Sequence, residues 1–476
     1  MKAFSLIILL LFTLSITKAQ TDKPCTTCPP QSITLTTQSQ VDNFHVNYPN
    51  CTAIIGGLEI SGNDITSLAG LNAITSDLSW LYISDCPALT SLAGLNNLGS
   101  IGNYLMIENC NALHNLSGLN NLVTIKSLTV TDCSNLENLS GLQNLTTING
   151  YIEIRNCSSL TSLTGLTGLS TFVSSLDISN CSSLITLDGL NNLAAVHGEF
   201  NIISCPSLNS LMALGNLQHI NGNFWLKGCN SLTKFTGLWN LADIWTSLIL
   251  ENNINLKSLG GFDHLTFLGG NVMIEQCDSL SSLAGMASLH KVGASIHITN
   301  CNSLTSMAGL ESLTSIGLTL DITGCGSLAS LHGIDNIAAG TIYTLNVSGN
   351  GALTSCAVHN ICDLLANPNG SIVISGNAAG CNSPQEVQDS CTLSGVLPVE
   401  SVMLPDFWPN PAIGLITVKT FTKGMVCLLN TAGQQVLVCS VNGAETVIDV
   451  RSLPAGLYVI RIVDQYKTRA GKIVIK

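Results

Sequence analysis

The chain has 476 residues, enough for two or three domains, and combines 46% hydrophobic residues with only 10% charged ones. Its charge is unevenly divided, because residues 20–391 contain 7 Lys and Arg against 24 Asp and Glu, whereas residues 392–476 contain 8 against 5. An acidic main body argues against a nucleic-acid partner, since such a partner requires a basic surface facing the phosphates.

Residues 1–19 have the pattern of a secretory signal peptide. Lys2 precedes the short apolar run LIILLLF, and Thr17-Lys18-Ala19 stand before Gln20. The run is too short to span a bilayer comfortably, and no second apolar segment of spanning length follows. We therefore expect export from the cytoplasm and no transmembrane segment after cleavage of the signal.

A repeat with steps of mostly 24 residues occupies residues 58–380. Its consensus is L-x-I-x-x-(C/N)-x-x-L-x-x-L-x-G-L-x-x-L-x-x-I. The alternating L-x-I portion indicates a strand, and the later spacing of three suits tight turns at the corners of a coil. The Cys/Asn position, which we call the turn column, contains Cys86, Cys110, Cys133, Cys157, Cys181, Cys205, Cys229, Asn253, Cys277, Cys301 and Cys325, and we also assign Asn63, Asn350 and Asn377 to it.

Each unit is too small to bury its own apolar face, so stacked units must share one core. A glycine follows most turn-column residues by eight positions, as Gly94 follows Cys86. Glycine there permits either a positive φ or a close backbone approach at a corner. The sequence thus predicts a mainly β fold built from stacked coils.

These units resemble known repeat families. The segment L-x-I-x-x-(C/N)-x-x-L resembles leucine-rich repeats, while GLxxLxxIxGxLxI and the early segment VDNFHVNYPNCTAIIGGLEISG resemble the receptor L-domain. The resemblance covers about residues 50–380 of the sequence. It implies a right-handed parallel β-solenoid and brings no catalytic residues with it.

Three interpretations of the turn-column cysteines compete: a disulfide ladder, a metal column and a structural turn residue. Asn cannot form a disulfide and is a poor ligand for soft metals, but both Asn and a thiol can hydrogen-bond to the backbone. Asn253 also leaves runs of seven and three cysteines, which cannot pair off completely. We interpret the column as structural and predict no metal site.

Other cysteines flank the solenoid. The ends of a solenoid need caps, and disulfides suit caps in a secreted protein. We assign residues 20–57 to an N-terminal cap and 381–400 to the end of the C-terminal cap and a linker. The spacing in CTTC resembles a redox motif, but no strand–helix context accompanies it. The disulfide candidates are Cys25, Cys28 and Cys51 at the first end, and Cys356, Cys362, Cys381 and Cys391, which we expect to form two bridges of open connectivity.

Residues 401–476 contain alternating strands separated by N-T-A-G, N-G and P-A-G turns, which predict a small β-sandwich. The segments WPNPA, LLNTAGQQV, LPAGLYVIRI and KIVIK resemble the Por (type IX) secretion-system C-terminal sorting domain, with Trp408 where that family usually has Tyr. The resemblance implies the type IX machinery as partner and the outer surface of a Gram-negative bacterium, or secretion from it, as destination. The motif residues are Pro409, Asn410, Pro411, Gly433, Gly456, Tyr458, Lys472 and Lys476.

The residues between the inward-facing positions of each strand point away from the core. These outward positions vary greatly, whereas the inward ones are monotonous. We expect Ile203, Trp225, Ile249 and Met273 to cluster on neighbouring coils, with Tyr82 and Met106 nearer the N-terminus, and an exposed apolar patch of this kind suggests a contact site. Cover by a cap or insertion, or drift without selection, would leave the same pattern.

No catalytic or cofactor-binding motif is present. We predict a non-catalytic binding or adhesion scaffold, no cofactor, and an unidentified extracellular protein or glycan as ligand. A solenoid carbohydrate-active enzyme, with carboxylates meeting across coils, is one alternative. A structural surface-layer component is the other.

Overall fold

The computed structural model describes residues 28, 31–75, 77–169, 172–393, 407–431, 434–464 and 468–476. The chain divides into two compact units, Met1–Val396 and Leu397–Lys476. The predicted signal peptide, Cys25, most of the predicted linker and Gly433 lie outside the described residues.

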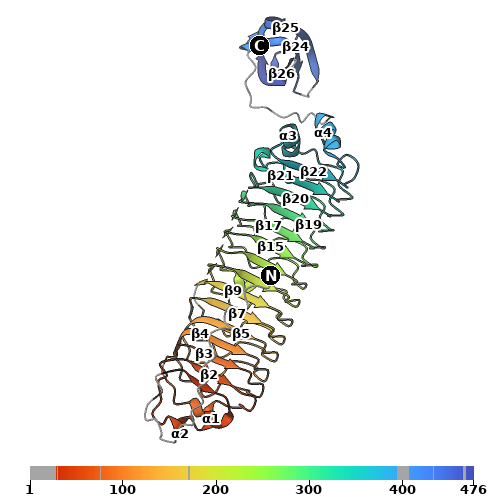
Figure 1. The fold of residues 1–476 in the computed structure, drawn as a ribbon. Coiled ribbons are helices and arrows are strands. Elements are labelled where there is room, and N and C mark those ends of the chain that lie inside the picture. The colour runs from red at the N-terminus through yellow and green to blue at the C-terminus, as the bar shows by residue number, and fades with distance from the viewer. Residues whose placement is uncertain are drawn as a thin grey trace. The chain divides into compact units, whose positions relative to one another are not determined.

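The first unit is a parallel β-solenoid, in which each coil contributes one strand to a long sheet (Figure 1). Neighbouring strands follow the order of the sequence, and β6 branches off by pairing with β5. In the described part of the chain the strands are β1 (Ile33–Leu35), β2 (Leu58–Ser61), β3 (Leu81–Ser84), β4 (Ser100–Glu108), β5 (Thr124–Thr131), β6 (Thr147–Ile148), β7 (Tyr151–Arg155), β9 (Ser175–Ser179), β11 (Phe200–Ile203), β13 (Phe224–Lys227), β15 (Leu248–Glu251), β17 (Val272–Glu275), β19 (Ile296–Thr299), β20 (Thr319–Thr323), β21 (Thr344–Ser348) and β22 (Ser371–Ser375).

A second, shorter parallel sheet runs along the middle coils. Its strands each have two residues, one exposed or partly exposed and one buried. Single turns of 3-10 helix occur at η1 (Ala69–Leu71), η2 (Met212–Leu214) and η3 (Ala339–Thr341). The described strands of this sheet are β8 (Phe172–Val173), β10 (Ala195–Val196), β12 (His219–Ile220), β14 (Asp243–Ile244), β16 (Phe267–Leu268) and β18 (Lys291–Val292).

The core is one continuous column of inward-facing Leu and Ile side chains, most of them fully buried. Aromatic rings widen it in the middle coils, where Phe200 stacks on Phe224 with ring centroids 5.0 Å apart and Phe235 contacts Phe262 at 4.5 Å. Burial of each such side chain contributes about 1.5–3 kcal/mol to folding. Because the column is shared between coils, no coil buries its apolar residues alone.

The corner glycines need both properties that the sequence suggested as alternatives. Gly189 has φ +122°, and a Cβ atom there would lie 2.1 Å from the carbonyl oxygen of Leu163 in the preceding coil. Nine further glycines in equivalent positions share the positive φ: Gly94, Gly118, Gly141, Gly165, Gly237, Gly261, Gly285, Gly309 and Gly333. The stacking distance between coils therefore depends on the missing side chain.

The first coil departs from the predicted alignment. Ile65 N–H donates to the Gly62 carbonyl, as Leu89 N–H donates to Cys86 in the next coil, so Gly62 occupies the turn column. Asn63 is exposed, and its assignment to the column was wrong. The reason is that this coil lacks the extra left-handed residue that precedes the column in the later coils.

Short helices and disulfides close both ends of the solenoid. At the N-terminal end, α1 (Gln38–Asp42) and α2 (Phe44–Asn47) bury Val41 and Phe44, and a disulfide joins Cys28 to Cys51. At the C-terminal end lie α3 (His359–Ala366) and α4 (Pro384–Leu393). There the structure pairs Cys356 with Cys381 and Cys362 with Cys391, which gives the connectivity that the sequence left open.

The second unit is a five-stranded, mainly antiparallel sheet with its own apolar core, which includes Val426 and Ile460. The strand order is β23-β27-β26-β24-β25, and β23 also pairs with β24, so four of the strands close into a ring. The described strands are β23 (Phe407–Ile413), β24 (Leu415–Leu429), β25 (Gln435–Asp449), β26 (Gly456–Asp464) and β27 (Thr468–Ile475).

Candidate binding face and sorting domain

The outward-facing side chains of the long sheet form a continuous surface, which we call the strand face. In β13, Phe224 and Leu226 are buried, whereas Trp225 and Lys227 are partly exposed. Parallel pairing places equivalent positions of neighbouring strands side by side. The strand face therefore consists of two rows along the solenoid: a first row at the Trp225 position and a second row at the Lys227 position.

Three apolar side chains of the first row lie next to one another. Trp225 pairs in register with Ile249, and Ile249 with Met273, of which 36% is exposed. We call these three residues the central patch. Ile203 belongs to the second row, where its register partner is Lys227, so it lies diagonally to Trp225.

Tyr82 and Met106 form a separate N-terminal patch. They are register partners on β3 and β4, and the strands β5, β7, β9 and β11 separate them from the central patch. Thr129, the next member of the first row, is only 4% exposed and interrupts the apolar surface. The six apolar residues predicted from the sequence thus lie in two places.

Trp225 has an unusual environment. Its indole Nε1 is buried and has no hydrogen-bond partner in the described part of the chain, and the same is true of Oδ1 of its neighbour Asn201. Lys227 Nζ lies 5.8 Å from the centroid of the Trp225 ring. An unpaired buried polar atom costs about 1–3 kcal/mol. Sites that sacrifice stability in this way are often functional.

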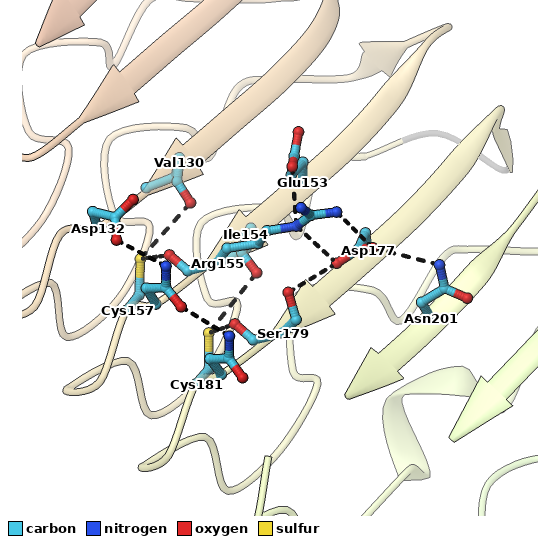
Figure 2. A network of polar contacts seen from close by, with 12 residues as sticks. Val130, Asp132, Glu153, Ile154, Arg155, Cys157, Asp177, Ser179, Cys181 and Asn201 are labelled. Carbon is cyan, nitrogen blue, oxygen red and sulfur yellow. Dashed lines mark hydrogen bonds and ion pairs between the residues drawn. The ribbon is translucent and has the colours of Figure 1, made fainter. Parts of the chain in front are cut away.

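An ion-pair network separates the two patches (Figure 2). Arg155 Nε lies 3.0 Å from Glu153 Oε1, and Arg155 Nη2 lies 3.0 Å from Asp177 Oδ2. Ser179 and Asn201 also donate hydrogen bonds to Asp177, at 3.1 and 3.4 Å. Burial raises the pKa of the Glu153 carboxyl, and the positive charge of Arg155 offsets part of that effect. Two carboxylates here share one cation.

The N-terminal patch contains a second buried polar contact. The Tyr82 hydroxyl donates to Glu108 Oε2 at 2.8 Å. Burial is the larger cause and this hydrogen bond the next, and together they raise the pKa of the Tyr82 hydroxyl to about 12. The phenol therefore stays neutral at physiological pH and remains a donor to the carboxylate.

The turn column forms a ladder of hydrogen bonds along the inside of the coils. Cys157 Sγ donates to the carbonyl of Arg155 at 3.4 Å and to that of Val130, one coil earlier, at 3.8 Å (Figure 2). Asn253 makes the corresponding contact to the preceding coil at shorter range, because its Nδ2 donates to the Leu226 carbonyl at 2.9 Å. It adds a contact that a thiol does not make, since its Oδ1 accepts from Cys229 N–H at 2.9 Å. Asn and Cys thus share the bond to the preceding coil.

The turn-column thiols are buried and free in the described structure. Burial raises the pKa of the Cys133 thiol to about 11, and it also raises the pKa of Cys229. A thiol in this state remains protonated at neutral pH, and the protonated form is a poor nucleophile. Cys133 and Cys229 therefore have the chemistry of core residues. A hydrogen bond from the thiol of the next coil lowers the pKa of Cys86 and of Cys277 instead.

A further column was missed by the sequence reasoning. From Cys86 onward, the residue before each turn-column position has a left-handed backbone, with φ between 50° and 70° in Asp85, Asn109, Asp132, Asn156, Asn180, Ser204, Gly228, Asn252, Gln276, Asn300, Gly324, Gly349 and Gly376. Asn, Asp and Gly tolerate this conformation best. Their side chains also bond across coils, as Asn156 does to Asp132 at 2.8 Å. The recurrence of Asp, Asn or Gly before Cys was the available signal.

In the second unit, Asn410 joins the first sequence motif to the last. Its Nδ2 donates to the Lys472 carbonyl at 2.8 Å, and its Oδ1 accepts from Val474 N–H at 2.9 Å. Pro409 and Pro411 have no N–H to offer a neighbouring strand. The Asn410 side chain therefore supplies the pairing that the flanking prolines cannot.

The other described motif residues hold the same sheet together. Tyr458 is buried, and its hydroxyl donates to the Pro454 carbonyl at 2.8 Å. Gly456 starts β26 and pairs with Ile475, while Lys476 N–H donates to the Ala412 carbonyl at 2.9 Å. WPNPA, LPAGLYVIRI and KIVIK are thus adjacent in space.

Residues 406–476 match the family model described as "Secretion system C-terminal sorting domain". Residues 82–185 and 198–328 match the model "BspA type Leucine rich repeat region" in six copies. The chain carries BspA-type leucine-rich repeats and a secretion-system sorting domain. No curated protein matches the chain. The sorting domain indicates secretion through the type IX system and a place at the outer cell surface.

Features of other kinds of chemistry are scarce in the described residues. No helix there is long and apolar enough to cross a membrane. No group of three or more His, Cys, Asp or Glu side chains in those ranges could hold a metal ion. The leucine-rich repeats therefore present the strand face as the surface with the most distinctive chemistry.

Proposed function

We propose that the protein is a non-catalytic binding or adhesion scaffold, whose leucine-rich repeats contact an extracellular protein or glycan through the strand face. The observation that carries this proposal is the central patch, where Trp225, Ile249 and Met273 stand in register as three consecutive apolar members of the first row. The inward positions are confined to apolar residues by packing, whereas the outward ones vary in size and charge. A constant frame with a variable face suits a repeat protein that binds partners.

The alternative of a carbohydrate-active enzyme needs two carboxylates close together. Two pairs of carboxylates are register partners on the strand face: Glu153 and Asp177, which both pair with Arg155, and Glu251 and Glu275. Lys227 forms an ion pair with Glu251, however, and so engages one of the two acids in the absence of substrate. This contact favours binding over hydrolysis.

The test is a screen of the purified full-length protein on glycan and extracellular-matrix arrays. Wild type is compared with Trp225→Ala and with Trp245→Ala, because Trp245 is 60% exposed but lies outside the strand face. We expect at least one ligand whose binding is lost in Trp225→Ala and kept in Trp245→Ala.

Other outcomes would count against the proposal. Equal loss in both variants would remove the strand face as the binding surface. If the protein binds nothing on either array and self-associates in light scattering, the result would favour a surface-layer component. Release of sugar from an arrayed glycan, abolished by Glu275→Gln, would favour the enzyme.

A further inference from the structure

The strand face carries more negative than positive charge. In the described strands its two rows contain, besides His297 beside Asp321, the basic residues Arg155 and Lys227 against seven carboxylates: Glu59, Glu108, Glu153, Asp177, Glu251, Glu275 and Asp321. Both basic residues are already engaged, Arg155 by Glu153 and Asp177, and Lys227 by Glu251. The surface therefore has carboxylates left without a cation.

Two of these carboxylates border the apolar patches. Glu275 follows Met273 by two residues on β17, and Glu108 follows Met106 by two residues on β4, so each points to the same side as its apolar neighbour. Neither has a cationic partner in the described part of the chain. An alkyl stem can pack on Ile249 and Met273 while its cationic head reaches Glu275, as Lys and Arg side chains commonly do.

Three aromatic rings on or beside the strand face are poorly placed for sugars. A sugar ring stacks on an open aromatic face, but Lys227 lies over the ring of Trp225. Trp80, near the N-terminal patch, stacks on Tyr104 with centroids 5.8 Å apart, and it lies so close over Gly57 that a Cβ atom there would be 2.0 Å from the indole. These contacts favour a polypeptide ligand over a glycan.

We propose that the two patches bind a cationic polypeptide segment, in which Lys or Arg side chains stand next to apolar ones. This inference rests on the proposed binding function and specifies its partner. Seven steps between neighbouring strands separate β4 from β17. At about 4.8 Å per step, Glu108 and Glu275 are about 34 Å apart along the sheet. An extended segment spans that distance in about ten residues, so two cationic groups at this spacing contact both patches at once.

The test uses a fluorescein-labelled peptide with two Arg-Leu pairs ten residues apart in a Gly/Ser sequence, and fluorescence anisotropy with the full-length protein. Two control peptides replace Arg by Glu, or Leu by Ser. Glu275→Gln removes one charge without changing shape, and Glu137→Gln is the matched variant, since Glu137 pairs with His114 away from the strand face. Circular dichroism checks that both variants fold.

We expect the Arg-Leu peptide to bind at least tenfold more tightly than either control peptide. Glu275→Gln should weaken its binding about threefold to tenfold, and Glu137→Gln by less than twofold. Equal binding of the Arg-Ser peptide, or no effect of Glu275→Gln, would overturn the inference. Array binding that depends on Trp225, without peptide binding, would overturn the partner class and leave the proposed function standing. Absence of both would overturn both.

Discussion

At the scale of single residues, the turn column explains why a thiol recurs in every coil. Its site is small, buried and bordered by carbonyl groups from two successive coils, and Cys or Asn fills it. A thiol makes weak hydrogen bonds but packs as a small apolar group. The column therefore ties adjacent coils together through the backbone rather than through covalent bonds.

Cys157→Ser tests this explanation. The shorter, more polar hydroxyl packs less well, so the free energy of unfolding should fall by about 1–2 kcal/mol in a denaturant titration. Thiol titration of the unfolded, unreduced protein should detect the twelve described free cysteines in wild type and one fewer in the variant. A wild-type count near zero would show a disulfide ladder instead. Ser158→Ala, at the exposed next position, is the control.

The ion-pair network supports a pair of opposite predictions. Asp177→Asn should lower the free energy of unfolding by about 1–2 kcal/mol, because Arg155, Ser179 and Asn201 all bind this carboxylate in a partly exposed site.

Glu153→Gln should leave the free energy of unfolding at pH 7 unchanged or raise it by less than about 1 kcal/mol, because burial raises the pKa of Glu153 and the charged form is therefore penalised.

The sign of the pH dependence follows from that raised pKa. A folded-state pKa above the unfolded value gives stability at low pH that is lost as the pH rises through the folded-state pKa. The advantage of Glu153→Gln over wild type should therefore be largest at neutral pH and vanish in acid. Thermal unfolding at a series of pH values measures it. An advantage that grows in acid would contradict the assignment.

At the scale of the element, the spacing of the coils depends on their corner glycines. Gly189→Ala would place a Cβ atom 2.1 Å from the Leu163 carbonyl oxygen at φ +122°, so the coils must separate or the backbone must change. We expect a loss of more than about 2 kcal/mol of unfolding free energy. Gly99→Ala is the matched control, because nothing lies within 4 Å of a Cβ atom there. Similar stabilities for the two variants would contradict this view of the corner.

Within the sorting domain, the pairing of β23 with β27 depends on the side chain of Asn410. Asn410→Ala removes both side-chain hydrogen bonds to β27. It should lower the local stability of the domain by about 1–2 kcal/mol, and proteolysis of the domain should therefore become faster. Asn410→Asp keeps the acceptor for Val474 N–H and loses the donor to Lys472, so its effect should be intermediate. Equal resistance of all three proteins would mean that the prolines alone position β23.

At the scale of the whole molecule, the repeats and the sorting domain form separate compact units with separate cores. Each coil contacts its neighbours, so the stability of the repeats should build up from local terms, and a change in one coil should act locally. Among the described residues, the two cores have no side chain in common. Removal of that domain should therefore change the destination of the protein without unfolding the repeats.

Deletion of residues 393–476 tests this division. We expect the shortened protein to be folded and retained in the periplasm, because the sorting domain directs passage across the outer membrane. Cell fractionation, together with protease treatment of intact cells, locates it. Its appearance on the cell surface would refute the sorting role.

The repeat, the parallel solenoid and the sorting domain could all be predicted from the amino-acid sequence. L-x-I and Cys recur about every 24 residues, and repeat units of this size must stack, because an isolated coil cannot bury its leucines. The motifs WPNPA and KIVIK likewise stand out without coordinates.

The side chains that meet across neighbouring coils could be identified only from the folded structure. Register separates Ile203 from the row of Trp225, divides the apolar residues into two patches, and brings Asp177 of the next coil to Arg155. The left-handed residue before the turn column is present in the later coils and missing from the first, which is why Gly62 and not Asn63 lies in the column. The sequence pattern of one repeat is enough to predict the structure of one coil. Contacts between coils depend on the register in which successive coils stack, and that register is set by the packing of the whole solenoid.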